Sequence, residues 1–268
     1  MIDLHIHLLP GVDDGPASWS EAVLLARRAV AEGVRTAVVT PHQIPDGPFC
    51  VESDHIREGV AELAERLQRE EIPLCVLPGA EVRLTPGTAA GLSAGEWMSL
   101  GDRGRAVLIE LPPGAIPLWT DQALFEIQLS GLVPLIAHAE RHEGLAADVA
   151  AGGERVRAWV ERGIRLQVNA SSLVRRRGRR ARIARRLLRA GWVHAVASDA
   201  HSLRRRPPEM GRGREAVRRL LGPRAAESLT SLWPAALLDG RALSAPAEER
   251  VPRWWWPLGG RWRAGRAR

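Results

Sequence analysis

Two histidines and two aspartates lie close together at the start of the chain. The segment MIDLHIHLLPGVDDGP contains His5, His7, Asp13 and Asp14. Side chains at positions i and i+2 of a strand point to the same side, so His5 and His7 could bind one cation. The H-x-H spacing alone is a weak signal, and its meaning depends on where the other histidines and acids lie.

Further histidines and acids follow five later apolar segments. These residues are His42, Glu81, Glu110, His138, Asp199 and His201. A charged side chain in an apolar strand is destabilising unless it is paired or bound to a metal. Imidazole and carboxylate ligands without a nearby thiolate favour Mn, Fe or Zn over copper. We therefore expect these side chains to share divalent cations, whereas each of them alone would be read as a hydrogen-bonded structural residue.

Strands and helices, which must position these residues, are expected to alternate along the chain. Seven near-continuous apolar segments are expected to be strands buried on both faces, over 1–5, 35–40, 74–80, 106–111, 133–138, 164–169 and 193–198. Helices are expected between them, over 52–71, 121–129, 154–162, 179–189 and 209–221, with a further one that begins at a Ser18/Glu21 capping box and is capped by Gly33. Such a series predicts a TIM-type barrel or a doubly wound sheet. In a barrel, all strand ends meet at one mouth, which would bring the histidines and acids together.

Composition limits the class of protein. The chain has 268 residues, of which 45% are hydrophobic, enough for a sizeable core. With only Cys50 and Cys75, a disulfide scaffold is excluded and a cytoplasmic location is expected. Neither a signal peptide nor a membrane-spanning segment is expected. The net charge of +7 would suit a nucleic-acid binder, but the chain has no lysine, which indicates a coding bias towards arginine, so no nucleic acid is expected.

Several motifs together resemble the PHP (polymerase and histidinol phosphatase) superfamily, and most closely its bacterial manganese-dependent protein-tyrosine phosphatases of the capsule and exopolysaccharide type. They include DLHIHLLPGVDDGP, AEGVRTAVVTPH, PGAEVRL, PLIAHAERH, LQVNASSL and VHAVASDAHSLRRRPPEM. The resemblance implies an α/β fold, a distorted seven-unit (βα)7 TIM-like barrel. It implies a phosphatase domain over 1–245, and we expect a loosely ordered Arg/Trp-rich tail over 246–268.

The resemblance also implies a cluster of three Mn ions, with Fe or Zn as alternatives. Its ligand sets are His5, His7, Glu81 and Asp199 for the first ion; Glu81, Glu110 and His138 for the second; and Asp14, His42 and His201 for the third. Arg141 and Arg206 would bind the substrate phosphate, and Asp13 is kept as the substitute for Asp14. Hydroxide formed from metal-bound water would attack phosphorus directly. We leave Glu140 and His194 as structural residues and expect Asn169 to cap a strand end.

The expected substrate is a phosphotyrosine protein, in particular a bacterial tyrosine autokinase. An alternative is a small-molecule phosphoesterase such as histidinol-phosphate phosphatase, because metal ligands define the reaction rather than the substrate. A third reading is an arginine-based binder of nucleic acid or membrane. The cysteine phosphatases are disfavoured because Cys50 and Cys75 do not have an arginine at the C-x5-R spacing. A homo-oligomer remains open.

Overall fold

The computed structural model describes residues 1–45 and 47–243. The tail predicted over 246–268 therefore lies outside the described residues. The strands are β1 (Ile2–Ile6), β2 (Thr36–Val39), β3 (His42–Gln43), β4 (Cys75–Pro78), β5 (Glu81–Arg83), β6 (Ala106–Glu110), β7 (Val133–Ile136), β8 (Arg165–Asn169) and β9 (Ala195–Ala197). Each of the seven predicted segments therefore contains a strand.

The strands pair in parallel in two sheets. Their orders are β1-β2-β4 and β3-β5-β6-β7-β8-β9. A single parallel bridge between Ile6 and Ala200 connects the end of β1 to the segment after β9. Parallel strands separated by helices confirm the predicted α/β fold. The pairing is that of two sheets rather than one continuous sheet of seven strands, so the closed seven-unit barrel stays a prediction.

Two predicted strands are interrupted near their carboxyl ends. Pro41 separates β2 from β3, since it has no N–H to donate to a neighbouring strand. Gly79 lies between β4 and β5, where a Cβ atom would approach Val38 Cγ1 to 2.6 Å. After these interruptions, β3 and β5 pair with each other and begin with His42 and Glu81.

The predicted helices are present with small shifts at their ends. They are α1 (Trp19–Ala31), α2 (Ser53–Arg69), α4 (Thr120–Leu129), α6 (Glu154–Glu161), α8 (Arg179–Arg189) and α9 (Met210–Leu221). Ser18 caps α1 by accepting from Glu21 N–H, and Glu21 accepts from Ala17 N–H. The helix ends at Ala31, and Gly33, with φ of 91°, completes its C-terminal cap as predicted: Gly33 N–H and Val34 N–H donate to the carbonyls of Val30 and Ala29, the pattern of a Schellman cap.

Five further helices had no clear sequence signal. They are α3 (Thr88–Ala94), α5 (Glu143–Ala151), α7 (Ala170–Val174), α10 (Pro223–Glu227) and α11 (Trp233–Asp239). A 3-10 turn over Leu100–Asp102 and a π-helical segment over Ser228–Leu232 complete the described part. Every helix in this part is too short or too polar to cross a membrane.

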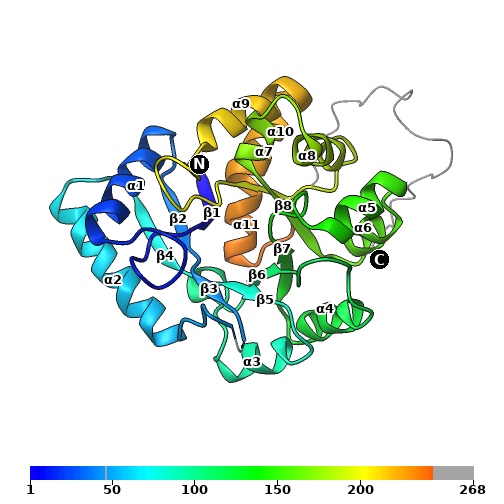
Figure 1. Ribbon diagram of the computed structural model, residues 1–268, viewed down its shortest axis with the longest axis horizontal. Helices are drawn as coiled ribbons and strands as arrows, with labels where there is room; N and C mark the ends of the chain where they lie inside the picture. The colour runs from blue at the N-terminus through cyan, green and yellow to red at the C-terminus, as the bar shows by residue number, and fades with distance from the viewer. Residues whose placement is uncertain (46, 244–268) are drawn as a thin grey trace, which may run out of the picture.

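Side chains from the strands form a small apolar core of their own with α11. Leu4, Val38, Leu108 and Leu135 pack there against Leu237 and Leu238 of α11. Figure 1 shows α11 among the strands, with α1, α2, α4 and α6 at the periphery. A second and larger core lies between the strands and the outer helices. The strands are thus buried on both faces, as their continuous apolar sequences predict.

Candidate metal centre

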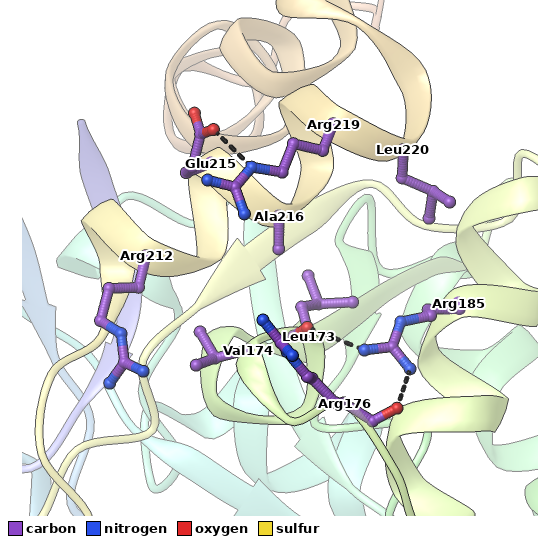
Figure 2. Close-up of a pocket in the computed structure, with 9 residues that line it drawn as sticks. All are labelled: Leu173, Val174, Arg176, Arg185, Arg212, Glu215, Ala216, Arg219 and Leu220. Atoms are coloured by element: carbon purple, nitrogen blue, oxygen red, sulfur yellow. Dashed lines mark hydrogen bonds and ion pairs between the residues drawn. The ribbon is translucent and has the colours of Figure 1, made fainter.

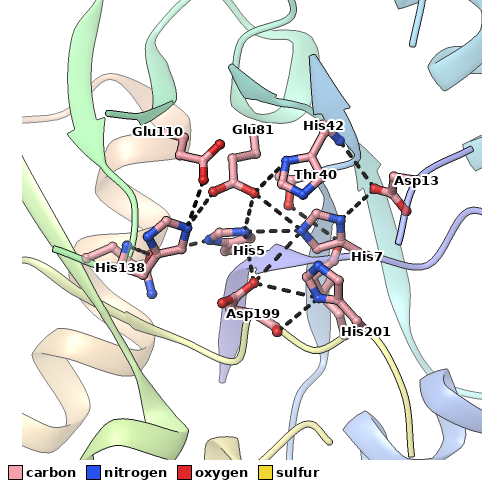
Figure 3. A network of polar contacts seen from close by, with 12 residues as sticks. His5, His7, Asp13, Thr40, His42, Glu81, Glu110, His138, Asp199 and His201 are labelled. Atoms are coloured by element: carbon pink, nitrogen blue, oxygen red, sulfur yellow. Dashed lines mark hydrogen bonds and ion pairs between the residues drawn. The ribbon is translucent and has the colours of Figure 1, made fainter. Parts of the chain in front are cut away.

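The nine residues that the sequence nominates as metal ligands lie around the carboxyl ends of the strands. They come from β1 and the loop after it (His5, His7, Asp14), from β3, β5 and β6 (His42, Glu81, Glu110), and from the segments after β7 and β9 (His138, Asp199, His201). Figure 3 shows eight of these side chains pointing towards one another. The structure therefore brings together residues that lie up to 196 positions apart in the sequence.

Three ligand atoms, from His5, His7 and Glu81, lie close together at the centre of the cluster, and an oxygen of Asp199 lies near both imidazoles. His5 Nε2 lies 3.3 Å from His7 Nε2 and 3.2 Å from Glu81 Oε2. Asp199 Oδ1 is 3.4 Å from His5 Nε2 and 4.0 Å from His7 Nε2. All four side chains are at most 1% exposed. This group matches the set that the family resemblance implies for a first ion.

Two further groups flank the central one. Glu81 Oε1 lies 2.7 Å from His138 Nε2, which is 3.9 Å from Glu110 Oε1. On the other side, Asp14 Oδ1 lies 3.3 Å from His42 Nε2 and 3.0 Å from His201 Nε2.

Two residues also lie close to ligand sets to which the resemblance did not assign them. His7 groups with Asp14, His42 and His201, and His42 also groups with Glu81 and Glu110.

Hydrogen bonds at the outer ring nitrogens fix the orientation of His5 and His7. Asp13 Oδ2 lies 2.6 Å from His7 Nδ1, and Gln167 Oε1 lies 3.3 Å from His5 Nδ1. A carboxylate and an amide oxygen only accept, so each Nδ1 carries a proton and each Nε2 is the nitrogen that faces the cluster. Asp13 is therefore placed as a partner of His7 rather than as a substitute for Asp14.

Strand β8 supplies two buried amides that the sequence reasoning missed. Gln167 Oε1 also accepts from His138 N–H at 2.7 Å, and Gln167 Nε2 donates to Asn169 Oδ1 at 2.8 Å. Asn169 Nδ2 in turn donates to Asp199 Oδ2 at 2.6 Å. Asn169 is the last residue of β8, at the strand end where it was expected, and its side chain contacts Asp199 instead of capping α7. The sequence signal for Gln167 and Asn169 was that two amides stand at positions i and i+2 of an otherwise apolar strand, so both point to the same side.

Charges within the cluster are strongly coupled before any cation binds. Burial opposes a charge on His7, but Asp13 and Glu81 raise the pKa of His7 to about 10. Burial also works against ionisation of Glu81, yet His5 and His138 hold the pKa of that carboxyl well below its usual range. Burial and then the charge of His7 lower the pKa of His201 to about 4. Glu81 is thus ionised, as a carboxylate ligand of a cation must be.

The donor set fits divalent cations. His42 Nδ1 and His201 Nε2 are buried and form no hydrogen bond of acceptable geometry, although carboxylate oxygens lie within 3.1 Å of both. Imidazole nitrogens and carboxylate oxygens are ligands that Mn, Fe and Zn share. His138 and Asp199 also have positive φ angles of 30° and 52°, a strained backbone that is concentrated at functional sites.

Both arginines nominated for phosphate binding lie at the cluster. Arg141 Nη1 and Arg206 Nη2 form ion pairs with the two oxygens of Asp199. Arg206 Nη1 lies 3.2 Å from Asp14 Oδ2. A guanidinium has five N–H donors, so both side chains keep donors for a further anion.

Two other polar residues near the cluster, Glu140 and His142, have structural partners. Glu140 Oε1 accepts from Ser172 Oγ at 2.6 Å and from Asn169 N–H at 3.2 Å. His142 caps α5: its Nδ1 accepts from Leu145 N–H, and its Nε2 donates to the Pro112 carbonyl.

His194 immediately precedes β9, at the opposite end of that strand from Asp199, and its Nδ1 accepts from Leu166 N–H. The assignment of Glu140 and His194 as structural residues agrees with these contacts.

Comparison with known proteins adds independent information. The model of a family described as "Capsular polysaccharide synthesis, CpsB/CapC" matches residues 1–239. The tyrosine-protein phosphatase YwqE of Bacillus subtilis is 36% identical over 207 residues, which cover 77% of this chain and 79% of that protein. The tyrosine-protein phosphatase CpsB of Streptococcus pneumoniae is 31% identical over 235 residues, which cover 85% of this chain and 94% of that protein.

A solved structure shares the fold. It is described as one of YwqE from Bacillus subtilis and CpsB from Streptococcus pneumoniae, "unique metal-dependent tyrosine phosphatases". Its TM-score is 0.83 at 32% identity, and the match covers 91% of this chain and 96% of that one. The similarity extends over nearly all the residues that carry the cluster.

Proposed function

Because the chain belongs to the CpsB/CapC family of capsular polysaccharide synthesis, we propose that it is a metal-dependent protein-tyrosine phosphatase. The observation that carries this proposal is the convergence of nine imidazole and carboxylate side chains next to two arginines. The relatives named as tyrosine-protein phosphatases support the substrate class.

The cluster would hold up to three divalent cations, with Mn as the first candidate and Fe or Zn as alternatives. His5, His7, Glu81 and Asp199 would hold the central ion. Glu110 and His138 would join Glu81 at the second, and Asp14, His42 and His201 would hold the third. Divalent cations supply Lewis acidity, which makes water a better nucleophile and offsets charge on phosphoryl oxygens.

The protein's own groups then position the substrate. Arg141 and Arg206 would each present paired N–H groups to the phosphate oxygens, a geometry that matches phosphate well. The charge that these oxygens develop during the reaction is stabilised by donors already in place, so little reorganisation is needed. Asp13 and Gln167 keep the imidazoles of His7 and His5 in the orientation that the site needs.

The proposal also covers the domain organisation and the physiological substrate. We propose that residues 1–245 form one phosphatase domain whose strands make a seven-unit barrel, with β2/β3 and β4/β5 each counting as one strand. The pairing of β2 with β4 and of β3 with β5 supports this count. A cytoplasmic tyrosine autokinase that controls capsule or exopolysaccharide synthesis is the proposed physiological substrate.

Phosphate release from a phosphotyrosine peptide tests the proposal. Purified protein should be active with Mn²⁺, lose activity after chelation, and regain it when Mn²⁺ is returned. Histidinol phosphate serves as the comparison substrate, and faster turnover of that compound would favour the small-molecule phosphoesterase. If protein with confirmed bound metal hydrolysed neither substrate, the proposal would be wrong.

A further inference from the structure

A second anion-binding feature lies outside the metal cluster, in a groove between α7, α8 and α9. The groove encloses about 450 Å³ and is lined by four arginines and one glutamate, namely Arg176, Arg185, Arg212, Arg219 and Glu215. Figure 2 shows these guanidinium groups at separate places around the hollow rather than around one point. Its floor is partly apolar, with Leu173 and Leu220.

The surface around this groove carries an excess of positive charge, although two of its four arginines pair with a carboxylate, Arg212 with Glu209 and Arg219 with Glu215. Residues 175–189 contain nine arginines, and no aspartate or glutamate lies between Glu161 and Asp199. By contrast, α2 contains four acids and three arginines. A coding preference for arginine over lysine does not explain a stretch of 37 residues without an acid. The local excess of positive charge is therefore a property of this surface.

The individual arginines differ in what they already contact. Glu215 is shared between Arg218 and Arg219, at 2.6 Å and 2.7 Å, so it cannot neutralise both. Arg185 donates to backbone carbonyls, which leaves its charge uncompensated by a carboxylate. Within residues 1–45 and 47–243, the exposed side chain of Arg176 forms no hydrogen bond or ion pair.

Two of the three helices that form the groove follow segments of the metal cluster along the chain. Helix α7 begins directly after Asn169, and α9 follows the segment that carries Asp199 and Arg206. The two helices cross closely, because a Cβ atom on Gly213 would lie 2.6 Å from Ala170 Cβ. Six residues lead from Arg206 to Arg212, so their Cα atoms are at most about 20 Å apart.

We propose that this groove binds an Asp/Glu-rich segment of the same polypeptide that presents the phosphotyrosine. The inference rests on the proposed phosphatase function and specifies which substrates that function favours. Separated guanidinium groups along an open groove suit carboxylates spaced along an extended chain, whereas a single phosphate needs donors that converge on one point. About six residues of extended peptide would cover the distance from Arg206 to the groove.

The expected effect is on substrate binding and not on the chemical step. Each exposed guanidinium–carboxylate pair contributes a factor of about two to five in affinity, so two or three pairs lower KM by about tenfold. The turnover number should stay the same, because the groove does not touch the reacting phosphate. Raising the salt concentration should reduce the advantage.

The test compares two phosphotyrosine peptides and two charge-reversal variants of the full chain. One peptide carries a run of glutamates about six residues from the phosphotyrosine, and the other carries serines there. R176E should reduce the preference for the acidic peptide by at least the factor of about two to five that one pair contributes. R180E is the matched control: Arg180 is also exposed and without a partner in the described residues, but it does not line the groove. Both variants should hydrolyse the serine peptide like the unmodified chain.

The possible results separate the two proposals. Equal KM values for both peptides, or an equal loss in R176E and R180E, would overturn the docking proposal while the phosphatase function stands. If neither peptide is hydrolysed, anisotropy of a labelled glutamate-rich peptide without phosphotyrosine still tests the groove, and binding that R176E fails to weaken overturns it. Tighter Arg176-dependent binding of duplex DNA or anionic vesicles would also overturn it.

Discussion

Replacing Gln167 by methionine is expected to weaken metal binding, although Gln167 is not a ligand. The side chain keeps a similar length but loses the oxygen that accepts from His5 Nδ1 and from His138 N–H, at 3.3 Å and 2.7 Å. Each buried donor left without a partner costs about 1–3 kcal/mol, so folding stability should fall by about 2–6 kcal/mol. Loss of such a support typically lowers metal affinity by about 10–100-fold.

The assay is a titration of metal-free protein with Mn²⁺, in which the affinity is measured by calorimetry or by competition with a chelator. Denaturant unfolding of the same samples measures the loss of folding stability. Q167E is the comparison variant, because it keeps the accepting oxygen while a second acceptor replaces the Nε2 that donates to Asn169. It should retain more metal affinity than Q167M, and excess Mn²⁺ should restore the activity of Q167M. A change of less than about threefold in the affinity of Q167M would refute the reasoning, since this is well below the range for such supports.

Three further predictions concern other parts of the molecule. H138A should lower metal content and phosphatase activity together, as measured by metal analysis and peptide turnover, because Glu81 and Glu110 lose their shared imidazole. R206A should keep its metal but lose about 10²-fold or more in kcat/KM, as expected for a donor that stabilises transition-state charge; normal turnover would show that Arg206 does not bind phosphate. Burial and then the charge of Arg165 lower the pKa of His194 from 6.5 to about 3, so the unfolded chain binds a proton that the folded chain excludes. The free energy of unfolding should therefore fall by about 2 kcal/mol between pH 6.5 and 5 from this group, and urea unfolding of H194Q should lack this part of the pH dependence.

Elements with strong local signals could be predicted from the sequence. The capping box at Ser18 and Glu21 is one example, because its bonds join residues three or four apart. The seven strands are another, since burial on both faces leaves a continuous apolar sequence. The ligand residues could be nominated because an imidazole or carboxylate at the end of such a strand stands out from its neighbours.

Features that depend on tertiary contacts could not be predicted in this way. The short helices α7 and α11 have too few turns to show a periodicity, and α11 is defined by its packing against side chains from the strands. The interruption at Gly79 follows from its approach to Val38, which is distant in the sequence. The contact between Asn169 and Asp199 could not be predicted, because the same amide at a strand end can serve as a cap or as the partner of a carboxylate.

A period of two along the strands explains why an apolar core and a polar cluster occupy the same interior. The inward side chain of β6 is Leu108, and two residues later it is Glu110. Four residues separate Val38 in β2 from His42, and Leu77 in β4 from Glu81. On each of these strands, the first inward-pointing side chains therefore lie in the core around α11, and the last one lies in the cluster.

Two ligands break this period, and both coincide with backbone irregularities. On β1, Leu4 faces the inner core, yet His5 joins the cluster; the register between β1 and β2 shifts between Asp3 and Ile6. After β7, Ala137 faces inward and His138 follows it with a φ of 30°. A bulge re-aims a side chain, and a strained φ persists only where surrounding contacts hold it. At His138, Gln167 supplies such a contact through the backbone N–H, so removing that oxygen should disturb this ligand beyond the loss of one hydrogen bond.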